Sequence, residues 1–510
     1  MKAKVVFKTY DQSQLSLLPP SYDDLVPLNH PVRTVNTIID QIDIAELERS
    51  YKGGGTSSYH PRMLLKVTIY AYLRNMYSSR RIEQALLENV HFMWLSGQSN
   101  PDHNTINDFR GKRLKGKFKN IFNQVVLLLA DQGILSLKEL FVDGTKIEAN
   151  ANRYTFVWGK SIKASKERIK KQLKELWSYV EKVYAEEQML PNQPYFGEID
   201  PEKVAQTIDT INEALKDKKI DKKVKQKLNY AKKNWPKNLQ KYNEQEAILG
   251  KRNSYSKTDP DATFMRMKDD AMQNGQLKPG YNLQASTNNQ FITNYTLAQT
   301  TADTTALKDH LKDHIESYDQ TPQTLTADAG YGSEENYTDL EEKNITAFVK
   351  YNYFHKEQRD KKHRENPFHP DNLFYNKETD TYYCPMGQAM KKVGSYHSET
   401  TTGFKQQIHR YQATNCKGCP LRGSCHKAKG NRAFERNHYL VRLKEKARTL
   451  LLSEEGIAHR KRRCWDVEAV FGNIKQNMGF KRFMLRGMDK VTTEIGLIAM
   501  AHNLRKFSIV

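Results

Sequence analysis

The positions of the strand-forming segments most constrain the fold that this chain can adopt. The apolar run Leu140–Val142 ends on Asp143-Gly144 and predicts a first strand. The next strand-like pattern begins at Tyr281, where apolar residues alternate on both sides of Asn288-Asn289 and predict a β-hairpin. Everything between them is polar or helical in periodicity. The pattern therefore predicts an α/β sheet that is interrupted by a long insertion.

Further segments extend this layer. Asp303 is placed to cap a helix that carries Leu307 and Leu311, and Thr324–Asp328 and Ile345–Val349 read as two more strands. Helices are expected around Trp465–Asn477 and over Val491–Phe507. The order strand, hairpin, helix, strand, helix, strand is typical of a compact α/β layer.

Two other regions are helical. From Pro61, helices are expected with start signals at Ser79 and Asp102, and the third helix is basic and carries Arg110. A helix-turn-helix and an ordinary helical bundle share this pattern, so DNA binding and simple packing both remain open. Residues 160–250 repeat narrow apolar seams, which predict a helical hairpin or a three-helix insertion. Its basic face is either solvated or a DNA-contacting arm.

The charge balance indicates a polyanionic partner. The 510 residues contain 81 Lys+Arg and 59 Asp+Glu, a net charge of +22 that is spread along the chain. A surplus that serves only solubility would give the same balance. The longest apolar runs, Val125–Ala130 and Ile495–Ala501, are far shorter than the ~18–20 residues that span a bilayer. No secretory signal is visible, so we expect neither a membrane protein nor a secreted one.

Four of the five cysteines are close together in the sequence. Four thiolates that include one Cys-x-x-Cys pair can close a tetrahedral Zn²⁺ site, and His409 or His426 could replace one ligand. Four reduced cysteines without a metal are the alternative. The residues concerned are Cys384, Cys416, Cys419 and Cys425.

Three acidic residues have suggestive positions. Asp143 and Asp328 each follow an apolar strand and precede small residues, and Glu468 lies beside Val467 on a predicted helix. A single acid is usually a cap or a solvated charge. Three together repel one another unless a cation lies between them, and hard carboxylate oxygens select Mg²⁺ or Mn²⁺.

The segments around these acids resemble the three acidic motifs of DDE transposases of bacterial insertion sequences. They are Phe141–Lys146, Thr326–Gly332 and Asp466–Lys475. The resemblance extends to Gly479–Gly487, to the helical region 60–130 and to the cysteine segment. It implies an α/β fold with an RNase H-like catalytic core, in which the first two acids lie on adjacent strands and the third on a packed helix.

By this resemblance, Asp143, Asp328 and Glu468 bind a pair of Mg²⁺ or Mn²⁺ ions ~3.5–4 Å apart. One ion would activate water or a DNA 3′-OH, and the other would stabilise the leaving oxygen. The implied partners are double-stranded DNA, as terminal inverted repeats and as target, and a second copy of the chain on DNA. A cytoplasmic, nucleoid-associated location follows. A catalytically silent, domesticated DNA-binding regulator and a nuclease without strand transfer are the alternatives.

Basic residues near Glu468 match the family in part. Lys475 fits the family lysine, as a phosphate contact or as a solvated charge, whereas Lys461 and Cys464 stand where many relatives have Tyr and Arg. Arg463 is one residue away and could replace the family arginine only if the helix start is rearranged. The other expected DNA contacts are Arg482, Arg486 and Arg110.

The expected organisation has five parts around an RNase H-like core, with a helical N-terminal domain, a long helical insertion and a small Cys-rich, zinc-binding insertion. They are an N-terminal arm (1–58), a helical DNA-binding domain (59–135), the core (136–155, 256–351 and 441–510), the helical insertion (156–255) and the Cys-rich insertion (352–440).

Overall fold

The chain is a mixed α/β protein with a helical N-terminal region. The computed structural model describes residues 21–51, 57–184, 200–216, 218, 220–267, 275–359 and 365–509. Contacts divide the chain into two units, one of Met1–Asp131 with Thr493–Val510 and one of Gln132–Thr492. Among the described residues, no helix has both the length and the apolar character needed to cross a membrane.

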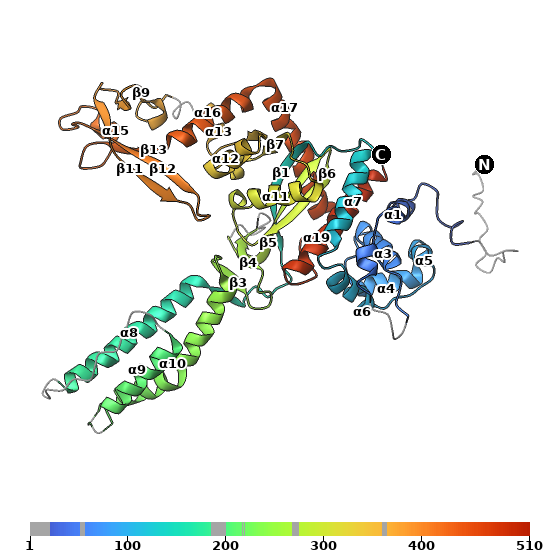
Figure 1. Ribbon diagram of the computed structural model, residues 1–510, viewed down its shortest axis with the longest axis horizontal. Coiled ribbons are helices and arrows are strands. Elements are labelled where there is room, and N and C mark those ends of the chain that lie inside the picture. Colours follow the sequence, from blue (N-terminus) through green and yellow to red (C-terminus); the bar gives the residue numbers. More distant parts are fainter. Residues whose placement is uncertain are drawn as a thin grey trace, which may run out of the picture. The chain divides into compact units, whose positions relative to one another are not determined.

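The first unit is built from helices (Figure 1). Helix α3 begins at Pro61 as predicted, and Asp102 caps α6 by accepting the Thr105 backbone N–H at 2.8 Å. The elements are α1 (Pro31–Asp40), α2 (Ala45–Glu48), α3 (Pro61–Leu73), α4 (Ser79–Glu88), α5 (Val90–Ser96), α6 (His103–Asp108), the π-helical turn η1 (Phe109–Arg113), α7 (Phe118–Asp131) and the C-terminal part of α19 (Met488–Phe507).

The second unit contains a six-stranded mixed sheet of order β4-β5-β1-β7-β8, in which β6 also pairs with β5. Strands β4, β1 and β6 run antiparallel to β5, whereas β7 and β8 run parallel to β1. The strands are β1 (Glu139–Glu148), β4 (Thr263–Arg266), β5 (Leu277–Asn288), β6 (Phe291–Ala298), β7 (Thr324–Ala327) and β8 (Thr346–Val349). The β5–β6 hairpin was predicted one residue too early: Asn288 pairs with Phe291, and Asn289 and Gln290 form the turn with positive φ.

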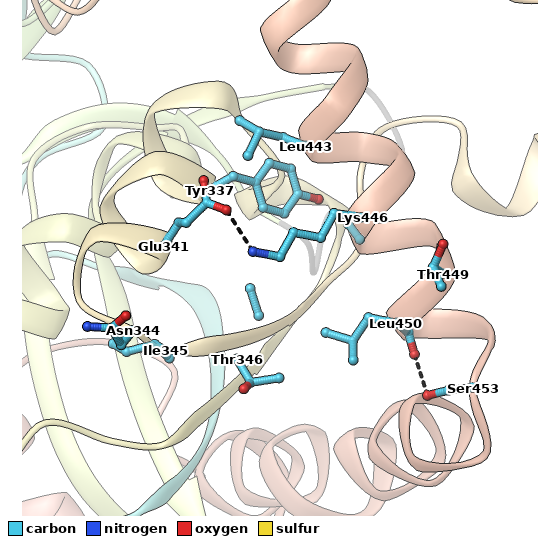
Figure 2. Close-up of a pocket in the computed structure, with 12 residues that line it drawn as sticks. Tyr337, Glu341, Asn344, Ile345, Thr346, Leu443, Lys446, Thr449, Leu450 and Ser453 are labelled. Carbon is cyan, nitrogen blue, oxygen red and sulfur yellow. Dashed lines mark hydrogen bonds and ion pairs between the residues drawn. The ribbon is translucent and has the colours of Figure 1, made fainter.

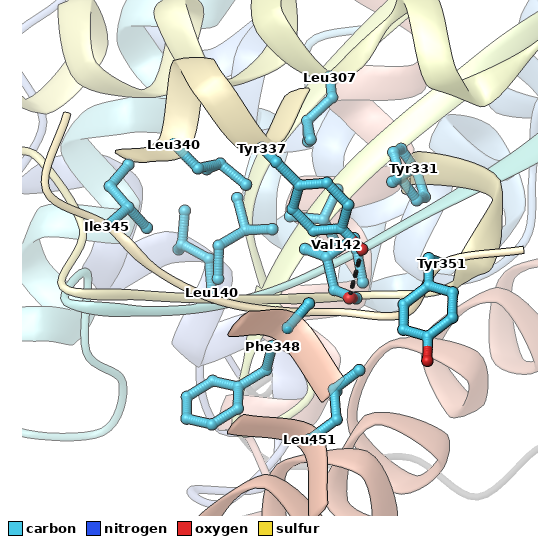
Figure 3. Close-up of a cluster of buried hydrophobic side chains, with 14 of the residues drawn as sticks. Leu140, Val142, Leu307, Tyr331, Tyr337, Leu340, Ile345, Phe348, Tyr351 and Leu451 are labelled. Atoms are coloured by element: carbon cyan, nitrogen blue, oxygen red, sulfur yellow. Dashed lines mark hydrogen bonds between the residues drawn. The ribbon is translucent and has the colours of Figure 1, made fainter. Parts of the chain in front are cut away.

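A hydrophobic core fixes β1, β7 and β8 between helices (Figure 3). Leu307 of α11 (Leu307–Tyr318) and Leu340 of α12 (Glu334–Glu342) pack on one side of these strands. Leu451 of α16 (His438–Leu452) packs on the other side, near Phe348. Each fully buried side chain of this size stabilises the fold by roughly 1.5–3 kcal/mol. The core therefore holds the first half of β1, up to Val142, and the C-terminal end of β7 in a defined position.

The segment after β1 is a helical insertion of three helices, α8 (Gly159–Val183), α9 (Pro201–Ala214) and α10 (Lys222–Leu249). Its seam is the predicted one, with Leu173, Ile208 and Trp235 in one buried cluster. The short strands β2 (Phe156–Trp158) and β3 (Ser254–Ser256) pair with each other at the two ends of the insertion, before α8 and after α10.

The cysteine segment contains a five-stranded antiparallel sheet that the sequence did not predict. Its order is β13-β12-β11-β10-β9, and Tyr382, Met390 and Tyr411 form its core. The strands are β9 (Phe374–Asn376), β10 (Thr381–Tyr383), β11 (Ala389–Glu399), β12 (Lys405–Ala413) and β13 (Ala433–Arg436). After α16, helix α17 (Glu454–Arg463) leads into the segment that carries Glu468.

Candidate acidic site

Asp143 and Asp328 occupy equivalent positions on adjacent parallel strands. The register pairs Phe141 of β1 with Thr326 of β7, and each aspartate comes two residues later. Neighbouring strands lie ~4.8 Å apart, so the register brings the two carboxylates to the same edge of the sheet.

The prediction that Asp143 ends its strand is wrong, because β1 continues to Glu148 through its antiparallel pairing with β5. What ends near Asp143 is the pairing with β7, which stops at Phe141, so β7 does not cover Asp143. Asp328 does follow its strand, and its Oδ1 accepts the Gly330 backbone N–H at 2.8 Å.

Glu468 closes a π-helical turn, η5 (Cys464–Glu468), which is tied to the sheet by polar contacts. The buried carboxylate of Asp466 accepts the Gln290 backbone N–H at 3.0 Å, and burial raises the pKa of Asp466. Arg462 donates to Glu139 Oε2 at 2.6 Å on β1. These contacts join the helix to β1 and to the β5–β6 turn, and they fix the position of Glu468. Sequence reasoning did not single out Asp466.

Arg463 contacts all three acidic residues. Its Nη1 donates to Glu468 Oε1 at 2.7 Å, and its Nη2 lies 3.2 Å from Asp143 Oδ2 and 3.8 Å from Asp328 Oδ2. The separation of the two aspartate oxygens is therefore at most the sum of those two distances, 7.0 Å. From the sequence, Arg463 was expected to replace the family arginine only if the start of the helix is rearranged.

The π-turn provides that rearrangement. In an α-helix, residues four apart lie on one face, whereas a π-turn joins residues five apart. Arg463 precedes Glu468 by five residues, and η5 spans the interval between them. The widened turn compensates for the additional residue and directs Arg463 at the carboxylate of Glu468.

The donors in this site match a hard divalent cation in kind, since all three acids offer carboxylate oxygens. A single guanidinium cannot balance three carboxylates, which leaves the pocket negative. No group of three or more His, Cys, Asp or Glu side chains within the described ranges is arranged to hold a metal ion. In the acidic pocket, the guanidinium of Arg463 is the cation that contacts the carboxylates.

The other predicted basic contacts are dispersed. Arg110 is only 2% exposed and donates to the Tyr72 hydroxyl and to the Tyr77 carbonyl, so in this conformation it is not available to a DNA phosphate. Lys475 is buried within the π-helical turn η6 (Asn473–Asn477). Arg482 and Arg486 are exposed residues that donate to backbone carbonyls of the segment after β1, at Ala149, Ala151 and Asn150.

Lys350 is a basic neighbour that sequence reasoning missed. It directly follows β8, where Ala327 pairs with Val349, so Lys350 is the register equivalent of Asp328 on the next strand. Burial lowers the pKa of Lys350, and the positive charge of Arg463 lowers it further. The strand register was the only signal for this residue, and it is not visible before the pairing is known.

The four clustered cysteines line one small cavity of about 30 Å³. All are free thiols, and the Arg432 guanidinium donates to Cys425 Sγ at 3.0 Å. The sequence prediction of a closed zinc site is not met by this arrangement, because no metal-holding group is formed among the residues described.

A separate hollow of about 690 Å³ lies between α12, β8 and α16 (Figure 2). Lys446 reaches across it to Glu341 at 2.7 Å. None of the predicted site residues lines this hollow, so it has no part in the acidic site.

Comparison with known families gives two matches. A family described as transposase DDE domain matches residues 383–508, and a family described as transposase domain (DUF772) matches residues 20–112. The first match includes Glu468 and the cysteine cluster, whereas Asp143 and Asp328 lie outside both. No curated protein and no solved structure matches the chain.

Proposed function

Because the chain belongs to the DDE-type transposases of insertion-sequence type, we propose that it cuts DNA at the ends of its own element and joins the freed 3′ ends to target DNA. Membership of the family implies DNA binding and nuclease or transferase chemistry in general. Which residues and which cofactor carry out this chemistry in this chain is proposed below.

One observation carries this assignment: two acids at equal register on adjacent parallel strands are joined to a helical glutamate through one arginine. This arrangement supports an RNase H-like core in which Asp143, Asp328 and Glu468 are the catalytic residues. The parallel pairing of β1 with β7 and the packing of η5 on the sheet are what such a core requires.

The proposed reaction is an in-line displacement at phosphorus. Water attacks the element-end phosphodiester, one P–O bond forms as another breaks, and a 3′-OH is released. That 3′-OH then attacks a target phosphodiester in the same way. Mg²⁺ or Mn²⁺, when bound, supplies positive charge for the attacking and leaving oxygens.

The chain's own residues prepare this site. Asp143 and Asp328 offer oxygens from the rigid sheet, and Glu468 closes the group from the helix. Arg463 and Lys350 lie where the scissile phosphate would enter, and both can neutralise its oxygens. The exposed Arg482 and Arg486 are proposed contacts to the flanking DNA backbone, and Lys475 is a proposed phosphate contact that requires local opening of η6.

Two further parts belong to the proposal. Cys384, Cys416, Cys419 and Cys425 are proposed ligands of a structural Zn²⁺, because all four line one cavity and thiolates suit that ion. A homodimer on double-stranded DNA is proposed because an element has two ends to bring together.

A metal-titrated cleavage assay on DNA that carries the element ends tests the function. Asp143→Asn and Glu468→Gln are expected to abolish Mg²⁺-dependent cleavage, whereas Glu316→Gln, an exposed acid on α11, should cut at the wild-type rate. Full cleavage by Asp143→Asn would exclude the proposed site. Wild-type protein that binds the ends without cutting them would instead favour the silent regulator.

Pre-cleaved ends with a free 3′-OH separate transposase from nuclease. Only a transposase is expected to insert these ends into a plasmid.

A further inference from the structure

Helix α10 of the insertion has two faces of opposite character. Its apolar face belongs to the buried seam, where α8, α9 and α10 lie side by side (Figure 1). The buried residues of this face include Leu228, Ala231, Trp235 and Leu239. With about 3.6 residues per turn, the opposite face carries a row of exposed residues at intervals of three or four. This row, the α10 stripe, consists of Lys222, Gln226, Tyr230, Lys233, Lys237 and Lys241.

The lysines beside the stripe are paired with acids of the same insertion. Lys227 Nζ lies 2.9 Å from Glu175 Oε2 of α8, and Lys232 Nζ lies 2.8 Å from Asp209 Oδ1 of α9. Within the part of the chain that the structure describes, no lysine of the stripe forms an ion pair. The acids of the insertion therefore neutralise the flanks of α10 and leave its outer face positive.

The charge pattern of the stripe differs from that of a helix that needs only to be soluble. Residues 222–243 contain no Asp or Glu, whereas α8 has glutamates among its lysines. Lys233, Lys237 and Lys241 follow one another at four-residue spacing, and like charges at this spacing destabilise a helix. A solvated face normally mixes charges of both signs. A row of one sign, present despite its cost to the helix, indicates an anionic partner.

The length and composition of the stripe fit duplex DNA. From Lys222 to Lys241 the helix rises about 28 Å, roughly the axial length of eight base pairs. Tyr230 lies between the lysines and is 58% exposed, so its hydroxyl can donate to a phosphate oxygen. The stripe contains no arginine, the side chain that most often reads a guanine edge. Its contacts are therefore suited to phosphates rather than to bases.

We propose that the α10 stripe binds the phosphate backbone of target DNA, whatever its sequence. An element end has one defined sequence, which base contacts can read, whereas a target is held through phosphate contacts that carry no sequence information. The proposal rests on the proposed function, because only a transposase has a target to hold.

Target binding by the full-length protein tests the proposal. The protein is assembled in EDTA on unlabelled, pre-cleaved element ends, and the anisotropy of a labelled duplex of arbitrary sequence is followed at several salt concentrations. The combined variant Lys233→Gln, Lys237→Gln and Lys241→Gln is expected to bind this duplex roughly 10–100-fold more weakly at about 0.1 M salt. The slope of log K against log salt should become shallower by about 2–3, since each phosphate contact contributes ~0.9.

A matched control removes the same charge from paired lysines of the same insertion. They are Lys166, which lies 2.6 Å from Glu246, together with Lys227 and Lys232. Replacing these three with Gln should change the slope by less than about 1. Arginine at the three stripe positions restores the charge and should restore binding, which a folding defect would not allow. If the stripe variant melts early, Lys237→Gln alone replaces it, with an expected slope change of about 0.9.

Two results would overturn the proposal. A stripe variant whose affinity and salt slope match those of the control does not use these lysines to hold DNA. An equal loss of binding to labelled element ends, measured with excess competitor duplex, would assign the stripe to the ends instead of the target. The proposed function survives both results if the wild-type protein cuts its element ends in Mg²⁺, whereas a wild-type protein that cuts none refutes that function itself.

Discussion

Replacing Arg463 with Gln removes the only guanidinium that contacts all three acids of the described site. The side chain of Asp143 is 9% exposed, so its charge would lose a partner that lies 3.2 Å away. Leaving a buried charge unpaired costs about 3 kcal/mol, at the low end of the usual range, because Asp143 also accepts the Gly144 N–H at 2.8 Å. Asp328 and Glu468 are 40% and 47% exposed, so water screens both, and together they add no more than ~1 kcal/mol.

The assay is thermal unfolding in EDTA. Unfolding entropy is ~2.1 cal/mol/K per residue, so a unit the size of Gln132–Thr492 shifts its melting temperature by about 1.3 °C for each kcal/mol. Arg463→Gln is therefore expected to lower the melting temperature by about 5 °C. Saturating Mn²⁺ should remove at least half of this deficit, because a bound cation takes over the compensation of charge.

Lys461→Gln is the matched control, since Lys461 is an exposed residue of the same helix and loses the same charge. It should melt within about 1 °C of the wild type. If Arg463→Gln melts with this control in EDTA, the guanidinium does not hold the acids together. The contact that the π-turn makes possible between Arg463 and Glu468 would then not stabilise the fold.

Three other perturbations have defined outcomes. His459 stacks on Phe348 and is buried, which lowers its pKa, so stability is complete above the ordinary value near 6.5 and falls as the pH drops toward the lowered one. His459→Phe should therefore unfold with a weaker pH dependence below about pH 6.5 in denaturant titrations. Trp235→Ala should destabilise the helical insertion by roughly 3–5 kcal/mol and expose α10 to limited proteolysis, while Mn²⁺ affinity stays unchanged. Cys416→Ser should lower the zinc content of purified protein, and a wild-type content below about half an equivalent would remove the zinc proposal.

Helices with strong local signals were predictable from the sequence. Pro61 and Pro201 begin their helices, Asp102 and Asp200 cap theirs, and the seam through Trp235 is the one observed. In each case, the structure depends on residues only a few positions away in the sequence, so the pattern is visible before the fold is known.

Features that depend on contacts between distant segments could not be predicted from the sequence. The extension of β1 past Asp143 depends on β5, whose residues follow more than a hundred positions later. Asp303 looks like a cap because caps are local, but two buried amides of β5 compete for its carboxylate. Lys350 acquires its position only from the register of β7 and β8. The strands β9–β13 were missed because β9, β10 and β13 have only 3, 3 and 4 residues, and because the longer β11 and β12 are mostly polar.

The π-turn before Glu468 also has a consequence for how such proteins are recognised in genomes. A search pattern with fixed gaps compares positions in the sequence, whereas a substrate contacts side chains arranged in space. One inserted amino acid can leave that arrangement unchanged when a single turn of the helix widens into a π-turn. A pattern that tolerates an offset of one position would therefore also recover chains in which, as here, the displaced arginine still contacts the glutamate.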